Sequence, residues 1–170
     1  YSVAICLAEN QHRLRDWSLA IVATDISEQS LRTAREGVFP PRAVASVTEK
    51  RRRRFFRYRK EDDRWQVRPE IKQLVEFERH NLIQPYPEPG FDCIFIRNVL
   101  IYFDRDSKRT VIDNLINALS IGGYLVVGPS EGIHDMLQPL QKSSPFLYQM
   151  KTAHRVYRLV VPGACLDFYV

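Results

Sequence analysis

Residues 91–104, with the sequence FDCIFIRNVLIYFD, constrain the fold of this chain more than any other stretch. The apolar run at residues 91–96 is too short for a helix of its own, and it follows a loop rich in proline and glycine. This pattern predicts a strand that is buried on both faces, as in parallel α/β sheets.

Arg97 and Asn98 follow that strand directly, among isoleucine, valine and leucine residues. Ligands of open α/β sheets lie outside the carboxyl ends of the strands, which makes the pair a candidate binding site. Burying an unpaired charge is costly, so Arg97 requires a partner or an open cleft. A structural role, as a helix cap or as the partner of an Asp, is equally well supported by position alone.

Two more predicted strands end in polar residues. The apolar segment 19–24 predicts a strand that leads into Asp25, and the next helix is capped by Ser27 and stopped by Gly37. A carboxylate at the tip of the second strand of a nucleotide-binding unit can accept both ribose hydroxyls. The alternative is that Asp25 is itself a helix cap.

The third strand, over residues 75–79, alternates apolar and charged residues and ends at Asn81 and Leu82. A polar and an apolar side chain at a strand end, followed by a proline-rich loop, suit the placement of an adenine ring. A plain surface crossover explains this loop at least as well.

The rest of the sequence predicts helices and short strands. Residues 43–56 predict a helix, and residues 55–59 and 64–68 predict a small two-stranded ribbon outside the core. After Asp104, apolar residues recur at helical spacing from Val111 to Leu119, and Gly122 and Gly123 are expected to end that helix.

Residues 124–127 then predict another buried strand. We expect residues 146–150 and 155–161 to form a terminal antiparallel pair around Ala153 and His154.

Length and composition indicate one domain with a substantial core, because the chain has 170 residues. No apolar run approaches the roughly 18 residues of a membrane span, so no membrane insertion is expected. The three cysteines, Cys6, Cys93 and Cys165, lie far apart among apolar residues. This spacing predicts reduced, buried thiols in a cytoplasmic protein. The histidines lack metal-ligand spacing, and no metal is assigned.

Residues 50–60, KRRRRFFRYRK, concentrate the positive charge of a chain whose formal net charge is +5. Such a run favours an acidic partner or nucleic acid. An acidic partner and a simple solvated helix face are about equally supported. Nucleic acid ranks third, and no recognition motif accompanies the run.

Taken together, these segments resemble the C-terminal domain of the CheR family, the chemotaxis receptor methyltransferases. The matching segments are ATDIS (23–27), ARxG (34–37), HNL (80–82), FDCIFIRNVLIYFD (91–104), GGYLVVGPSE (122–131) and FLY (146–148). The resemblance runs from Tyr1 to about Leu159. The combination of RNVLIYF with GGYLxxGxSE is specific to the family, whereas ATDIS alone is not.

The resemblance implies a class I, Rossmann-like methyltransferase fold of three α/β layers, in a single domain over residues 1–170. A small β-ribbon insertion lies at about residues 50–72. The implied cofactor is S-adenosylmethionine (SAM), and the implied product is S-adenosylhomocysteine (SAH). The implied enzyme is a cytoplasmic protein-glutamate O-methyltransferase that acts on methyl-accepting chemotaxis receptors.

The resemblance also implies roles for the residues at the strand ends. Asp25 takes the ribose hydroxyls, Asn81 and Leu82 border the adenine, and Arg97 and Asn98 line the cofactor pocket.

By the same resemblance, Tyr102 is expected to point toward the methyl group and the incoming carboxylate, which makes Arg97 and Tyr102 the candidate catalytic residues. The basic ribbon corresponds to the receptor-docking subdomain of the family. Its candidate partner-binding residues are Arg51, Arg52, Arg53, Arg54, Arg57 and Arg59.

The chain departs from the family at its start and at Pro129, where a His is usual. In the family, a central strand, a glycine-rich loop and a helical domain precede the position of Tyr1, and these 170 residues contain none of them. We therefore expect a fragment of a longer enzyme that is inactive alone. Without the central strand, two buried strands would each have an unpaired edge.

The chemistry agrees with the residues present. A glutamate is ionised near neutral pH, so its methylation requires no general base. The enzyme must align the reactants and exclude water, and Arg97 is expected to orient and neutralise the carboxylate. Two other classes stay open: a non-catalytic module that binds SAM or receptor, and a basic nucleic-acid-binding domain.

Overall fold

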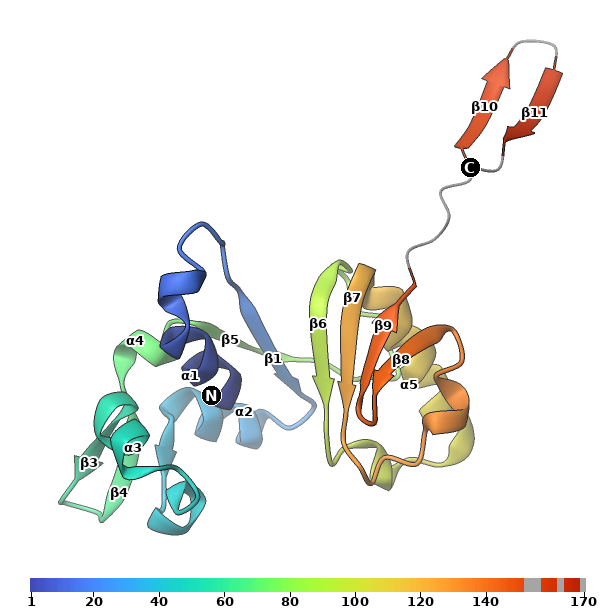
Figure 1. Ribbon diagram of the computed structural model, residues 1–170. Coiled ribbons are helices and arrows are strands. Elements are labelled where there is room, and N and C mark those ends of the chain that lie inside the picture. Colours follow the sequence, from blue (N-terminus) through green and yellow to red (C-terminus); the bar gives the residue numbers. More distant parts are fainter. Residues whose placement is uncertain (152–156, 162–163, 169–170) are drawn as a thin grey trace. The chain divides into compact units, whose positions relative to one another are not determined.

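The computed structural model describes residues 1–151, 157–161 and 164–168 (Figure 1). The chain forms two compact units, Tyr1–Asn81 and Leu82–Val170. The expectation of one domain over residues 1–170 stays a prediction. Within the described ranges, no helix combines the length and the apolar character needed to cross a membrane.

The first unit contains a parallel pair of strands, β1 (Ile21–Asp25) and β5 (Val75–Arg79), in which Asp25 lies opposite Arg79. Helix α1 (Ser2–Glu9) begins the unit, and helix α2 (Glu28–Glu36) follows β1. The predicted ends of α2 are confirmed. Ser27 Oγ accepts a hydrogen bond of 3.2 Å from the N–H of Ser30, and Gly37 has the left-handed φ of 63° that ends a helix.

The predicted ribbon is confirmed as β3 (Phe56–Arg59) and β4 (Arg64–Val67), which pair antiparallel. A further strand, β2 (Val38–Phe39), pairs with β4 and completes a three-stranded sheet. Helix α4 (Pro69–Lys72) leads from this sheet to β5.

The helix predicted over residues 43–56 is wrong in its first half. Pro41–Val44 form a 3-10 turn, and α3 (Glu49–Phe55) begins only after Thr48, whose Oγ accepts a hydrogen bond from the N–H of Arg51 at 3.4 Å. The core of this unit is formed by residues of α1, the 3-10 turn, α3, α4 and the small sheet. It comprises Ala4, Ile5, Val44, Phe55, Phe56, Val67 and Ile71.

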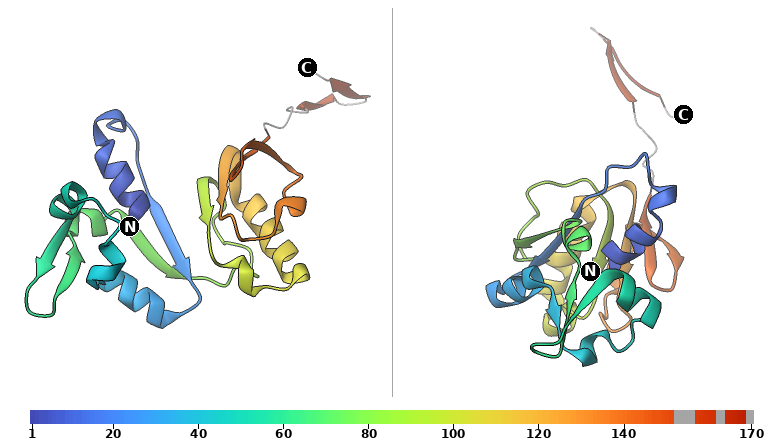
Figure 2. Two further views of the ribbon diagram at one scale, coloured as in Figure 1. Left: turned by 60° about the horizontal axis from the view of Figure 1, so that its bottom comes forward. Right: turned by 90° about the vertical axis from the view of Figure 1, so that its left-hand side faces the viewer.

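The second unit contains a four-stranded sheet in the order β6-β7-β9-β8. Strands β6 (Phe91–Ile96) and β7 (Leu119–Val127) are parallel. Strand β9 (Leu147–Met150) is antiparallel to both β7 and β8 (Leu140–Ser144). Helix α5 (Arg105–Ala118) lies along one face of the sheet (Figures 1 and 2).

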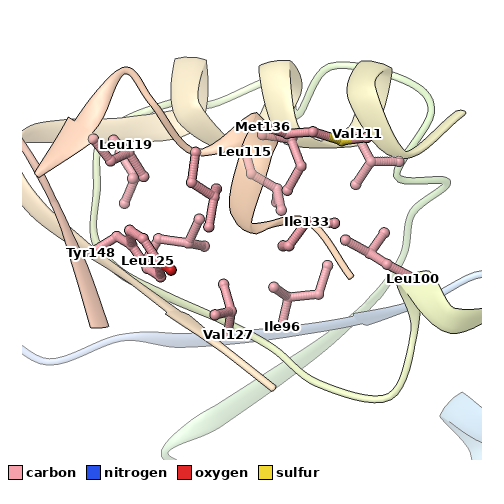
Figure 3. Packing of buried hydrophobic residues seen from close by; sticks show 13 residues of the cluster. Ile96, Leu100, Val111, Leu115, Leu119, Leu125, Val127, Ile133, Met136 and Tyr148 are labelled. Atoms are coloured by element: carbon pink, nitrogen blue, oxygen red, sulfur yellow. The ribbon is translucent and has the colours of Figure 1, made fainter. Parts of the chain in front are cut away.

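The core of the second unit lies between α5 and this face of the sheet (Figure 3). Leu100, Val111, Ile112, Leu125 and Ile133 have no exposed surface. The 3-10 turns Leu100–Tyr102 and His134–Met136 contribute to the same cluster.

The prediction that β6 is buried on both faces is wrong. Ile96 is buried in the core, whereas Phe95 is 58% exposed and Cys93 is exposed as well. The difference arises because α5 covers one face of the sheet. The prediction of buried thiols is therefore also wrong for Cys93 and for Cys6, which is exposed on α1. The side chain of Cys165 lies outside the described residues.

The prediction that Gly122 and Gly123 end the helix after Asp104 is wrong as well. Helix α5 ends at Ala118, and Gly122 and Gly123 lie inside β7. A Cβ atom on Gly123 would lie 2.9 Å from the carbonyl oxygen of Ser120 and 3.0 Å from that of Phe91. The glycine is required there for close approach between backbones, and not as a helix stop.

The predicted terminal pair is also wrong. Strand β9 pairs with β8, while β10 (Tyr157–Val161) pairs with β11 (Ala164–Phe168). The predicted turn at Ala153 and His154 lies outside the described residues. Strand β8 escaped prediction because its sequence, LQKSS, has one apolar residue and four exposed ones.

Among the described residues, β1 pairs with β5 alone and β6 pairs with β7 alone. Each of these strands therefore has one edge without a partner in the described chain. This agrees with the expectation that the described residues do not supply the central strand.

Candidate cofactor site

Asp25 lies at the carboxyl end of β1, and its side chain is exposed. Its Oδ1 accepts a hydrogen bond of 2.8 Å from the N–H of Ser27. Ser27 caps α2, so Asp25 is not the helix cap that the sequence left open.

Asn81 comes to the same end of the two-stranded sheet. The N–H of His80 donates a hydrogen bond of 3.1 Å to the carbonyl oxygen of Asp25, which extends the β1–β5 alignment by one residue. Asn81 follows at once and is half-buried. The structure thus brings Asp25 and Asn81, both predicted from strand ends, to one edge of the first unit.

Leu82 begins the second unit and packs against its core. Its carbonyl oxygen accepts a hydrogen bond of 3.0 Å from Nδ2 of Asn114 on α5. This contact ties the start of the loop before β6 to the helix.

Arg97 and Asn98 follow β6, and both are exposed. Among the described residues, the guanidinium of Arg97 has no hydrogen bond or ion pair. The alternative of a helix cap or a structural ion pair for Arg97 therefore has no support. Asn98 has the left-handed φ of 59°, a conformation that Asn adopts more readily than most residues.

Tyr102 ends the 3-10 turn after Asn98 and is 83% exposed. Its N–H donates to the carbonyl oxygen of Val99 at 3.3 Å. Arg97, Asn98 and Tyr102 are therefore three exposed side chains on the six residues that follow β6.

Glu131 is a site residue to which the sequence analysis gave no role. It is 1% exposed, and it is the one charged side chain that is buried among residues 1–151. Its carboxylate accepts hydrogen bonds from the N–H groups of Asn98 and, at 2.8 Å, Leu100. The available signal was a Glu directly after a buried strand and a glycine, in GPSE.

The six candidate arginines of the basic run differ in their contacts. Arg51 forms two hydrogen bonds with Glu9, of 2.8 and 2.7 Å, which lower the pKa of the Glu9 carboxyl group. Arg53 pairs with Glu49, and Arg59 pairs with Asp62 at 3.2 Å.

Two arginines lie over aromatic rings, Arg52 at 5.4 Å from the ring centre of Trp65 and Arg54 at 5.0 Å from that of Phe55. Arg57, on β3, is exposed and has no ion pair among the described residues. The basic run is thus partly neutralised within the chain, and Arg57 is its least engaged candidate.

A cavity of about 430 Å³ lies elsewhere in the first unit. It is lined by aromatic residues and by α2, and its lining comprises Tyr1, Gln29, Ser30, Thr33, Ala34, Phe39 and Phe77. None of the predicted cofactor residues lines this cavity, so it is a separate feature.

The strand-end residues fit an adenosyl group in their chemistry. An exposed carboxylate at the end of β1 can accept hydrogen bonds from two neighbouring hydroxyl groups. The exposed guanidinium and amide after β6 can donate to a carboxylate or to a carbonyl group.

Residues 1–146 match the family model described as "CheR methyltransferase, SAM binding domain". The chain belongs to this CheR family. The class I methyltransferase fold and SAM as the cofactor, both implied by the resemblance, are confirmed by this match. The family assignment covers both units, from α1 to the loop before β9.

CheR relatives among curated proteins agree with the match. The chain is 37% identical over 157 residues to the chemotaxis protein methyltransferase of Vibrio parahaemolyticus, covering 89% of this chain and 57% of that protein. It is 39% identical over 136 residues to the chemotaxis protein methyltransferase Cher2 of Pseudomonas putida, covering 77% of this chain and 49% of that protein. The chain thus spans about half the length of these curated relatives.

Among solved structures, the chain is similar to a TehB-like SAM-dependent methyltransferase from Corynebacterium glutamicum. The TM-score is 0.44 and the identity is 18%, with 76% of this chain and 66% of that chain covered.

Proposed function

We propose that this chain is the SAM-binding part of a protein-glutamate O-methyltransferase that modifies chemotaxis receptors. The CheR family match over residues 1–146 carries the proposal. The names of the relatives, chemotaxis protein methyltransferases, support the same assignment.

When bound, SAM supplies a sulfonium methyl group, which a glutamate oxygen takes as the carbon–sulfur bond breaks, leaving a methyl ester and SAH. The residues of this chain bind and align the reactants. Asp25 accepts hydrogen bonds from the ribose hydroxyls, Asn81 and Leu82 border the adenine, and Arg97 and Asn98 line the cofactor pocket.

Arg97 and Tyr102 act on the substrate carboxylate. The exposed and unpaired guanidinium of Arg97 supports a role in orienting and neutralising a carboxylate. A tight ion pair would lower the nucleophilicity of the carboxylate oxygen, so Arg97 guides the substrate and does not activate it. The exposed phenol of Tyr102 contacts the incoming side chain.

The module of α3, β3 and β4 docks the receptor in this proposal. Its exposed arginines favour association with helices rich in glutamate, because opposite charges steer the encounter. Arg57 is the strongest candidate, since neither an acidic group nor an aromatic ring of the described chain engages it.

A test of the proposal is methyl transfer from labelled SAM to a receptor fragment, using the protein expressed from its gene with any residues that precede Tyr1. Alkali hydrolyses a glutamate methyl ester and releases volatile labelled methanol. An N-methyl group is stable to alkali and releases none. We expect alkali-labile label on the receptor, and none on a matched receptor with Gln at its acceptor positions.

SAM binding without any label on the receptor would instead identify a non-catalytic module. Alkali-stable label would show a methyltransferase of another specificity.

A further inference from the structure

We propose that Glu131 is a positioning residue for the cofactor pocket. Its buried carboxylate fixes the backbone after β6 in the conformation that presents Arg97 and Asn98. The inference deepens the proposed function and rests on the cofactor-binding roles assigned there to Arg97 and Asn98.

The first observation is the pair of hydrogen bonds that Glu131 accepts. The N–H of Asn98 donates to Oε1, and the N–H of Leu100 donates to Oε2 at 2.8 Å. A buried carboxylate is costly unless its oxygens accept such bonds. The two bonds therefore explain both the burial of Glu131 and the course of residues 98–100.

The second observation is the conformation of Asn98. Its φ of 59° lies in the left-handed region, which Asn tolerates better than most residues but which still costs energy, so neighbouring contacts help to hold it. The bond from its own N–H to Glu131 is such a contact. Losing that bond removes a restraint at the residue that lines the proposed pocket.

The third observation links Glu131 to Arg97 through Gly128. A Cβ atom on Gly128 would lie 2.8 Å from Oε1 of Glu131 and 3.0 Å from Cγ of Arg97. The carboxylate and the base of the Arg97 side chain thus flank the same Cα atom, with no space for a methyl group between them. Added bulk at Gly128 would therefore press on both side chains.

Glu131 is itself anchored from α5. Nζ of Lys108 donates a hydrogen bond of 2.9 Å to the backbone carbonyl oxygen of Glu131. On either side of the loop, Leu100 and Ile133 are fully buried in the core shown in Figure 3. The carboxylate is thus anchored next to the buried core of the second unit.

The alternative is a purely structural role, in which Glu131 stabilises the fold but leaves cofactor affinity unchanged. Glu131→Gln separates the two roles. Gln has nearly the same shape and one carbonyl acceptor, but its amide NH₂ cannot accept the second N–H. Glu88→Gln is the matched control, because Glu88 is an exposed residue of the loop before β6.

The experiment is calorimetric titration of SAH into the protein expressed from its gene, well below the melting temperature of each variant. We expect Glu131→Gln to weaken SAH binding by roughly tenfold, because losing one hydrogen bond to a charged group lowers the population of the backbone conformation that binds. We expect Glu88→Gln to bind SAH as the wild type does. Amide hydrogen exchange at Asn98 and Leu100 should be faster in Glu131→Gln without ligand.

Wild-type SAH affinity in a folded Glu131→Gln protein, with only the melting temperature lowered, would overturn the positioning role. No saturable SAH binding by the wild type would instead overturn the proposed cofactor assignment, and the inference with it. If Glu131→Gln does not fold, SAH binding by Gly128→Ala decides between the two roles.

Gly128→Ala provides a second variant, which retains Glu131 in the sequence but crowds its carboxylate. We expect it to weaken SAH binding as well, because Arg97 and Glu131 cannot both keep their positions. Unchanged SAH affinity in a folded Gly128→Ala protein would contradict the coupling to Arg97.

Discussion

The N–H of Ser27 donates a hydrogen bond of 2.8 Å to Oδ1 of Asp25, two residues earlier. Ser27 in turn caps α2 through its own Oγ. The turn between β1 and α2 thus orients the Asp25 carboxylate at the strand end without using it as the helix cap.

Asp25→Asn should therefore weaken SAH binding by about 1.5–3 kcal/mol, the contribution of a hydrogen bond to a charged group. The melting temperature of the ligand-free protein should barely change, because the Asn side chain retains an oxygen that can accept from Ser27. Calorimetric titration and thermal unfolding measure the two effects. Asp16→Asn, at an exposed loop position of the same unit, is the control.

A large loss of stability in Asp25→Asn, with unchanged SAH affinity, would show that the carboxylate serves the turn alone.

Arg57→Gln should weaken receptor association roughly twofold to fivefold at low salt, in the range expected for one exposed ion pair. The effect should disappear at high salt, because screening shortens the reach of exposed charges to about 10 Å at 0.1 M. SAH affinity should not change. Surface plasmon resonance at several salt concentrations measures the association.

Receptor association of Arg57→Gln is compared with that of Arg51→Gln, because the guanidinium of Arg51 already pairs with Glu9 within the chain. Equal receptor affinity of wild type and Arg57→Gln at low salt would contradict the prediction. It would show that β3 is a solvated surface with no part in receptor docking.

The Glu9–Arg51 pair predicts a pH dependence of stability. Its hydrogen bonds lower the pKa of Glu9 below the ordinary value of 4.5 in the folded protein. The contribution of the pair is therefore present above pH 4.5 and is lost as the pH falls through the lower, folded pKa. The difference in melting temperature between wild type and Glu9→Gln should be small near neutral pH and should shrink further in acid.

A difference in melting temperature that stays constant from neutral pH into acid would contradict this assignment. High salt should also reduce it, because the pair lies at the surface.

The open edges of β1 and β6 predict the behaviour of the isolated 170-residue chain. Unpaired strand edges favour association between copies, so we expect oligomers or aggregates. The exposed Phe95 on β6 adds apolar surface to the same effect. We also expect no detectable methyltransferase activity. Light scattering after size-exclusion chromatography, with the labelled-methyl assay, measures both.

A stable monomer of these 170 residues that methylates receptor glutamates would contradict this prediction. It would also show that the expected place of Tyr1, after the glycine-rich loop of the family, is wrong.

Local signals in the sequence predicted the elements around the site. Ser27 and Gly37 gave both ends of α2, because capping and left-handed glycine are properties of a few neighbouring residues. The apolar run before Arg97 gave β6 to the residue. The chain positions of Asp25 and Arg97 at strand ends followed from these elements.

Features that depend on distant neighbours were not predictable in this way. One face of β6 is exposed because α5 covers only the other face of the sheet. The apolar sequence of the strand does not show which face is covered. Gly123 resembles a helix stop in sequence, yet it permits an approach to Phe91, which lies far away in the chain. Glu131 accepts hydrogen bonds from residues 31 and 33 positions earlier, so its role required the structure.

The most direct test of the central claim, that this chain belongs to a SAM-binding protein, is equilibrium dialysis of labelled SAM against the protein expressed from its gene. We predict saturable binding that SAH displaces and that excess ATP does not, because the proposed site recognises the ribose and adenine together with the methionine end. The absence of saturable SAM binding to the folded protein, or equal displacement by ATP, would contradict the account.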